Sequence, residues 1–261
     1  MSGKWWGHFE LPEGVAGRWQ VGPLALRIEH RPNEWYVEHQ VGTNPLSTEF
    51  AVEVPCLDGR QLQGTSVRFA SARTTSAVIL RPALADRPIV ARPIVPLVVP
   101  AGESVGLFVG SPVWLQLGWA ERPETLLDLA TFRPSDTWFG PSPAVGELCY
   151  STRTGARLRL DESAARPGRV ATALTVSNHG PDALSIEHIK LPIPQLTLHA
   201  SADGQLWSQA ITFRRGADDD HAEVHLCEGP PAEAGSTVCV AEARRGAEGN
   251  AFQRALSALL N

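Results

Sequence analysis

Apolar and polar residues alternate along much of the chain, most clearly from residue 172 to residue 207. Leu174 and Val176 fall on one face of a first run, and Leu184 and Ile186 fall on one face of the next. Asn-His-Gly-Pro-Asp and Asp-Gly turn sequences separate the runs. A period of two between turn signals is typical of half-buried antiparallel strands, because successive side chains point to opposite faces of a sheet. This segment therefore predicts part of a β-sandwich.

The same pattern begins near the amino terminus. Leu24, Leu26 and Ile28 alternate, a turn sequence follows at residues 31–34, and the alternation returns from Trp35. Such an arrangement predicts a β-hairpin. In the later segment the apolar positions change from even to odd numbers after Ile186, and one extra residue, a bulge near residues 187–188, would keep them on one face.

Prolines interrupt the pattern between Arg81 and Pro100, where a near-repeat, Arg-Pro-Ile-Val, starts at Arg87 and again at Arg92. Proline cannot donate a hydrogen bond to a neighbouring strand. We therefore expect edge strands or extended polyproline-like chain here, and no central strand.

Two short helices and two domains complete the predicted architecture. Pro123 stands at a suitable first helical position, and the apolar residues from there to Phe132 do not alternate with polar ones, so we predict a linking helix over 123–132. Asn250 is a candidate cap for a carboxyl-terminal helix, whose apolar side would hold Phe252, Leu256 and Leu259. The prediction is an all-β protein with two antiparallel β-sandwich domains: residues 1–120, a linker of helix and loop at 121–145, and residues 146–261 with the terminal helix.

Composition is ordinary for a globular protein and excludes several functions. The 261 residues are 43% hydrophobic and 20% charged, and the net charge is −5. Without a basic stripe, nucleic acid is not an expected partner. No apolar run reaches the roughly 18 residues of a membrane span, and the first residues lack the apolar stretch of a signal peptide, so we expect a cytoplasmic protein that does not insert into membranes.

The four cysteines fit that compartment as reduced thiols, and no C-x-x-C motif occurs. Cys227 and Cys239 are placed so that they could face each other across a hairpin, but the inferred compartment argues against a disulfide there.

Residues 102–106 match G-x-S-x-G, the nucleophile elbow of α/β-hydrolases, with Ser104 as the nucleophile. That elbow requires a helix directly after the serine. The residues that follow predict a strand instead, and Pro112 falls where the helix would run. We interpret the motif as a glycine-rich turn between strands.

The richest cluster of metal-ligand residue types follows an acidic turn. If residues 222–226 form a strand, His221, Glu223 and His225 share its outer face. Two imidazoles and a carboxylate are suitable ligands for a divalent metal ion. Side chains two positions apart on a strand lie about 7 Å from each other, which is wide for such ligands. The alternative is a solvated polar strand face.

Trp138 and Phe139 lie in a stretch rich in proline, glycine and serine, which we expect to be a surface loop. Exposed aromatic residues there would stack on a sugar or anchor a protein partner. The alternative is that they fill the junction between the two domains.

Three short motifs stand out in the chain: Asp-Thr-Trp-Phe-Gly at 136–140, Gly-Glu-Leu-Cys-Tyr-Ser-Thr-Arg-Thr from Gly146, and the Gly-Pro-Leu strand start at Gly22. In these motifs the sequence resembles a prokaryotic family, domain of unknown function 432. The resemblance implies a soluble prokaryotic protein of about this length and transfers no catalytic residues. Such proteins are sometimes encoded beside mechanosensitive channels, so it also hints at a membrane protein as a partner.

Three hypotheses on function follow. The leading one is a non-catalytic protein-interaction module, because the sequence contains strands with proline-bearing edges and no coherent reaction centre. The second is an enzyme with a divalent metal ion at His221, Glu223 and His225. The third is a small-ligand or carbohydrate-binding protein that uses Trp138 and Phe139.

Overall fold

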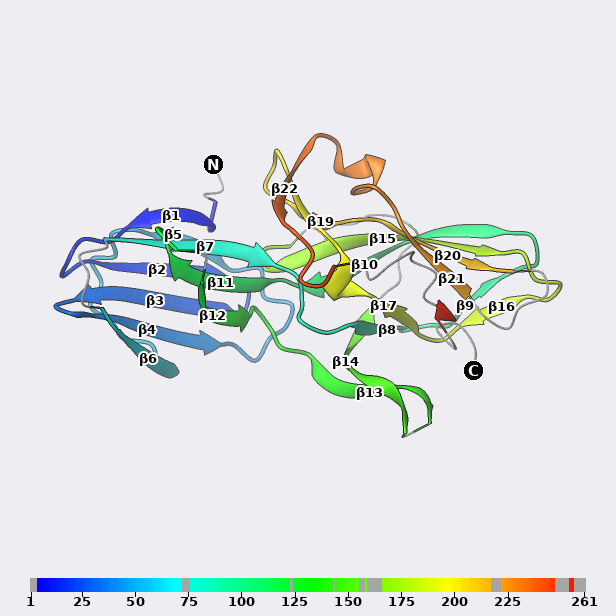
Figure 1. The fold of residues 1–261 in the computed structure, drawn as a ribbon, viewed down its shortest axis with the longest axis horizontal. Coiled ribbons are helices and arrows are strands. Elements are labelled where there is room, and N and C mark those ends of the chain that lie inside the picture. Colours follow the sequence, from blue (N-terminus) through cyan, green and yellow to red (C-terminus); the bar gives the residue numbers. More distant parts are fainter. Residues whose placement is uncertain are drawn as a thin grey trace. The chain divides into compact units, whose positions relative to one another are not determined.

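The computed structural model describes residues 4–71, 76–122, 124–142, 144–154, 158, 166–216, 222–246 and 254–255. Throughout these residues the protein is all-β (Figure 1). The described part has no α-helix, only two single-turn 3₁₀ segments, η1 (Ile193–Gln195) and η2 (Ala232–Ala234). It also has no helix long and apolar enough to cross a lipid bilayer.

The chain forms two compact units, and each is assembled from several segments. Unit 1 comprises residues 1–83, 112–133 and 166–169, and unit 2 comprises residues 84–111, 134–165 and 170–261. The chain thus passes back and forth between the units, whereas the expected domains were contiguous halves.

Unit 1 contains two sheets in which every pair of neighbouring strands is antiparallel. The four-stranded sheet has the order β1-β7-β11-β12 and the five-stranded sheet the order β5-β2-β3-β4-β6. The strands are β1 (Gly7–Glu10), β2 (Ala16–Val21), β3 (Leu24–Arg31), β4 (Glu34–Val41), β5 (Phe50–Glu53), β6 (Thr65–Ala70), β7 (Ala77–Ala83), β11 (Trp114–Trp119) and β12 (Thr125–Ala130).

Aromatic contacts join these two sheets. Trp35 of β4 is fully buried, and its ring centroid lies 5.5 Å from that of Trp119 of β11. Phe9 of β1 meets Trp19 of β2 edge to face at 5.1 Å. Edge-to-face and tilted aromatic pairs add to the free energy of burial, so these contacts are central to the core of unit 1. Trp19 and Trp35 are therefore core residues of unit 1.

Unit 2 contains the remaining sheets, and the two larger ones mix parallel and antiparallel pairs. An eight-stranded sheet has the order β22-β18-β19-β15-β20-β21-β23, with β10 also paired to β15; the others are β13-β14-β8-β17 and β16-β9. The strands are β8 (Ile89–Pro93), β9 (Leu97–Val99), β10 (Ser104–Pro112), β13 (Ser135–Ser142), β14 (Val145–Thr154), β15 (Arg169–Asn178), β16 (Leu184–Ile186), β17 (Ile189–Leu191), β18 (Leu198–Ser201), β19 (Leu206–Ser208), β20 (Ile211–Arg215), β21 (Ala222–Leu226), β22 (Thr237–Ala241) and β23 (Arg254–Ala255).

The prediction of purely antiparallel sheets is wrong for unit 2. β14 pairs with β8 in parallel, and β15 is parallel to both β19 and β20. These parallel neighbours are separated by long stretches of sequence, and alternation of apolar residues does not reveal strand direction.

The prediction of a linking helix is also wrong, because residues 125–130 form β12, the edge strand beside β11. The expected bulge after Ile186 is instead a break: β16 pairs with β9, whereas β17 pairs with β8 in another sheet. The expected carboxyl-terminal helix lies outside the described residues except for residues 254–255, which form β23.

Central strands do occur in the proline-rich stretch, contrary to the prediction. β7 lies between β1 and β11, but Pro82 lies beyond Leu80, the last residue of β7 that pairs with β1. β8 lies between β14 and β17, and Pro93 is its last residue. The prolines therefore occupy strand ends, where a missing N–H removes no internal hydrogen bond.

Candidate binding surface on the β13–β14 hairpin

Trp138 and Phe139 lie on a strand, not in the loop that the composition suggested. β13 pairs with β14 so that Trp138 is opposite Leu148 and Phe139 is opposite Glu147. Neighbouring residues of a strand point to opposite faces. The two aromatic side chains therefore do not form one surface, and Trp138 shares its face with Leu148.

The hairpin holds the indole ring of Trp138 in place. Its Nε1 donates a hydrogen bond to the carbonyl oxygen of Ser142 at 3.0 Å, and the backbone N–H of Val145 donates to Ser142 Oγ at 3.1 Å. A Cβ atom at Gly146 would lie 2.7 Å from Trp138 Nε1. Only glycine leaves room for the ring at this position, so the indole lies against the backbone of β14.

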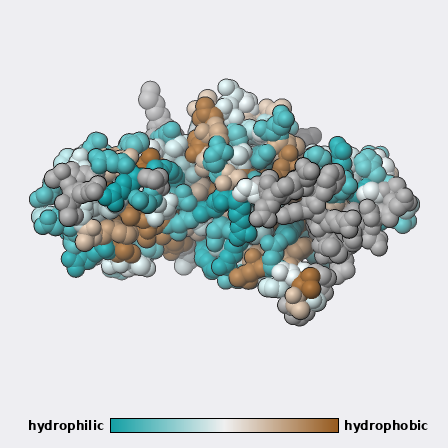
Figure 2. Space-filling view, in the orientation of Figure 1, coloured by the Kyte–Doolittle hydropathy of each residue, from teal (hydrophilic) through white to brown (hydrophobic). Residues whose placement is uncertain are grey.

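One apolar side chain on the neighbouring strand borders the outward side of this ring. Trp138 is 50% exposed and Leu148, on the same face, 44%. Val145 is also exposed, but it lies three positions from Leu148 on β14 and therefore points to the other face. Figure 2 shows hydrophobic residues at the surface of this hairpin. Isolated exposed apolar residues are common on protein surfaces, but here an exposed tryptophan is fixed in place beside a second exposed apolar residue, so we take this pair as the candidate binding surface.

Phe139 on the opposite face is partly buried against β17 and the residue before it. Its ring meets that of His188 edge to face at 5.8 Å, and Lys190 Nζ lies 5.7 Å from its centroid. Lys190 also forms an ion pair with Glu147. Burial, together with the positive charge of Arg92, lowers the pKa of His188 below its ordinary value. Phe139 thus anchors the hairpin to its sheet.

A polar network borders the Trp138 face. Asp136, two residues before Trp138, forms an ion pair with Arg87 at 3.1 Å. Tyr150 donates a hydrogen bond to Asp86 at 2.9 Å, and the guanidinium of Arg87 lies 5.4 Å from the Tyr150 ring centroid. Arg87 compensates the charge of Asp136, and the hydrogen bond to Asp86 fixes Tyr150, so this network positions the side chains beside Trp138.

The predicted metal ligands are only partly described. His221 lies outside the described residues. Glu223 and His225 are exposed on one face of β21, whose bounds agree with the predicted strand. Among the described residues no three His, Cys, Asp or Glu side chains are grouped closely enough to hold a metal ion. The metal site remains a prediction, which metal analysis of untagged protein would test.

The G-x-S-x-G motif is confirmed as a turn followed by a strand. Gly102 has φ +77°, and Ser104 begins β10. The Ser104 hydroxyl donates to Ser177 Oγ at 2.8 Å. A nucleophile elbow needs a helix after the serine and a base beside it, and the structure provides a strand and a second hydroxyl.

The cysteines are free thiols, and none is paired with another. Burial raises the pKa of Cys149 to about 11. Burial and the carboxylate of Glu242 raise the pKa of Cys239, which lies opposite His199 on the neighbouring strand. A raised pKa disfavours the reactive thiolate, so neither residue is an activated nucleophile.

The sequence pattern missed Leu148, which completes the apolar surface beside Trp138. The alternation of Leu148 with Cys149 and Tyr150 could have indicated a strand, but only the pairing of β14 with β13 shows which residues share the tryptophan's face.

Comparison with the curated proteins and with the solved structures found no match. The family described as "Protein of unknown function (DUF432)" matches over residues 5–259, nearly the whole chain. The match agrees with the resemblance of the short motifs at residues 136–140, Gly146 and Gly22. The chain therefore belongs to the DUF432 family.

Proposed function

We propose that this protein is a non-catalytic protein-binding module, built from two β-sandwich units, and that the Trp138 face of the β13–β14 hairpin is its contact surface. The observation that carries the proposal is a half-exposed tryptophan, fixed by a hydrogen bond to Ser142 and paired across the strands with exposed Leu148. Tryptophan in such a setting is the residue type that most often dominates binding energy at protein interfaces.

The surroundings of Trp138 favour a protein over a sugar as the ligand. A sugar needs polar groups beside the aromatic ring to bind its hydroxyls. Here the nearest cross-strand neighbour is Leu148, and the charged side chains of Asp136 and Arg87 are paired with each other. An apolar partner surface would lose no hydrogen bonds on contact with this face.

Site-specific crosslinking in the native host tests the proposal. A photoreactive amino acid replaces Leu148 in one variant and Leu57, an exposed apolar residue of unit 1 that is 94% exposed, in the control. We place the protein in the cytoplasm, and the membrane fraction is sampled as well, since a membrane protein is one proposed class of partner. We expect position 148 to capture a defined protein that position 57 does not.

The Trp138→Ala variant completes the test. It should lose the captured band at position 148 while the protein remains folded, because the side chain is half exposed. The same bands at both positions, or a band at position 148 that survives Trp138→Ala, would contradict the proposal.

A further inference from the structure

β13 is the end strand of its sheet, in the order β13-β14-β8-β17, and no described strand lies on its other side. An end strand presents main-chain N–H and C=O groups that can pair with another chain. The register of the sheet shows which of these groups point to the open edge.

Tyr150 sets that direction. Its backbone N–H donates to the carbonyl oxygen of Pro88 at 2.8 Å, so the main-chain groups of Tyr150 face β8. Along a strand these groups alternate in direction, so those of Cys149 and Ser151 face β13. The main-chain N–H and C=O of Leu148, like those of Tyr150, point away from β13, and the residue opposite Leu148 on β13 is Trp138. Leu148 and Trp138 are therefore a non-hydrogen-bonded pair, and the backbone N–H and C=O of Trp138 point to the open edge.

From Ser135 to Phe139 this edge lacks the features that usually protect end strands, whereas the last residues of β13 contain Pro141 and a register irregularity. Lysine, proline and bulges discourage pairing with other chains. From Ser135 to Phe139 the strand has no lysine, arginine or proline, and its one charged residue, Asp136, is paired with Arg87. The irregularity in pairing with β14 comes only after Phe139.

The size of the apolar surface indicates what kind of partner fits. Trp138 and Leu148 together expose on the order of 200 Å² of side chain, given their exposed fractions. A stable globular interface buries about 800 Å² on each partner, so this surface alone is too small for a second folded copy. Strand addition obtains its affinity from main-chain hydrogen bonds and needs less side-chain area.

We propose that the partner presents an extended peptide segment, which adds to the free edge of β13 as a further strand, with an apolar side chain at every second position beside Trp138. This inference rests on the proposed function and names its partner class. The occupant is a protein segment in extended conformation, recognised by its backbone and by alternate apolar residues.

A peptide selection on the full chain provides the probe. A random nonapeptide display library is selected for binding to the wild-type protein, and Trp138-dependent peptides are synthesised with and without N-methyl groups on the amides that would face β13. The control variant is Val238→Ala, which removes an exposed side chain (64%) from β22, another end strand.

We expect the parent peptides to bind wild type and Val238→Ala equally and Trp138→Ala more weakly. We also expect them to slow hydrogen exchange of the Trp138 backbone amide by at least about tenfold, and N-methylation to abolish binding. A selection that yields no Trp138-dependent peptide overturns the inference, as do equal affinities of parent and N-methylated peptides, or self-association through β13 that Trp138→Ala removes. If position 148 captures a protein whose binding leaves the Trp138 amide exchange unchanged, strand addition fails while the proposed function stands.

Discussion

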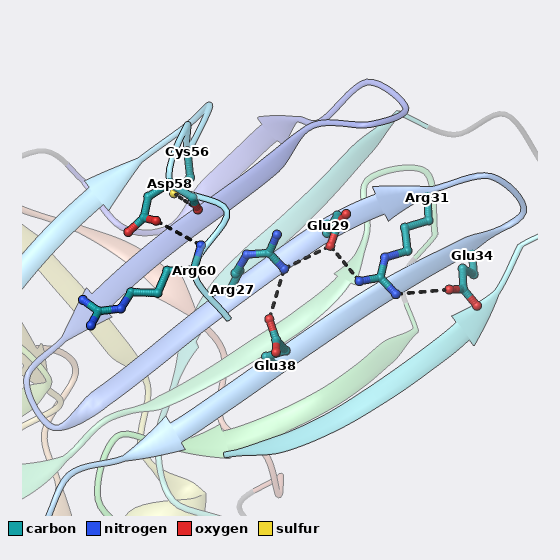
Figure 3. A network of polar contacts seen from close by, with 8 residues as sticks. All are labelled: Arg27, Glu29, Arg31, Glu34, Glu38, Cys56, Asp58 and Arg60. Atoms are coloured by element: carbon teal, nitrogen blue, oxygen red, sulfur yellow. Dashed lines mark hydrogen bonds and ion pairs between the residues drawn. The ribbon is translucent and has the colours of Figure 1, made fainter. Parts of the chain in front are cut away.

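The ion pair between Arg27 and Glu38 gives the sharpest prediction about stability. The two residues lie on neighbouring strands of the five-stranded sheet in unit 1, and Arg27 Nη1 lies 3.0 Å from both Glu38 and Glu29 (Figure 3). The side chains of Arg27 and Glu38 are only 6% and 4% exposed. Among the described ion pairs Glu38 has Arg27 as its basic partner, whereas Glu29 is also paired with Arg31.

This arrangement predicts unequal effects of removing each partner. Arg27→Met leaves the Glu38 carboxylate buried without its cation, and we expect a loss of about 3–5 kcal/mol in the free energy of unfolding. Glu38→Gln leaves Arg27 with Glu29 and with an amide oxygen that still accepts a hydrogen bond, so the loss should be about 1–2 kcal/mol. The double variant Arg27→Met with Glu38→Leu buries no unpaired charge and should lie within about 1 kcal/mol of wild type.

Urea titration followed by tryptophan fluorescence and circular dichroism measures these values. Because the chain has two units, each unfolding curve is first tested for a single transition. The explanation is refuted if Arg27→Met costs less than Glu38→Gln, or if the double variant is as unstable as Arg27→Met. Either result would show that the stability comes from packing and not from charge compensation.

Three further predictions concern unit 2. Asn178 is fully buried and donates hydrogen bonds to the carbonyl oxygens of Val99 and Asp182, so Asn178→Ala should lower the urea-derived free energy of unfolding by about 3 kcal/mol. Gly146→Ala brings a Cβ atom against a neighbouring backbone oxygen at 2.6 Å and should cost about 1–3 kcal/mol, whereas Gly106→Ala, with no atom within 4 Å, should be nearly neutral. The lowered pKa of His188 means that the folded state disfavours the protonated imidazole. The contribution of neutral His188 to stability is therefore complete above pH 6.5 and declines as the pH falls below that value. His188→Gln should remove this part of the pH dependence, measured as the free energy of unfolding between pH 7 and pH 5.

The sequence pattern predicted strands well where one face is buried and the other is not. The hairpin from Leu24 is β3 and β4, and Asn33 in its turn has φ 61°, which asparagine tolerates. Leu174 and Val176 are buried on β15 as the alternation required. In these places the local pattern and the tertiary environment agree.

The pattern failed where pairing decides the structure. Residues 125–130, Thr-Leu-Leu-Asp-Leu-Ala, have good helix formers and no alternation, yet they form β12 because β11 offers an edge to pair with. No residue of β12 is fully buried, so no alternating pattern was needed to fill a core. Intrinsic helix propensity is a weak preference, and a neighbouring strand overrides it.

The candidate surface shows the same limit at the level of function. Trp138 was recognisable from the sequence as an aromatic residue in unusual surroundings, but its partner Leu148 and the direction of its backbone were not. The partner follows from the pairing of β13 with β14, and the backbone direction follows from the parallel pairing of β14 with β8, which joins residues 89–93 to residues 150–154. Because the Tyr150 amide bonds to Pro88, the Trp138 amide must face outward. The direction of the proposed binding edge is therefore set by strands some sixty residues apart in sequence. Any substitution that shifts the register of β14 on β8 by one residue should turn the Trp138 amide inward and abolish binding, even with the Trp138 side chain in place.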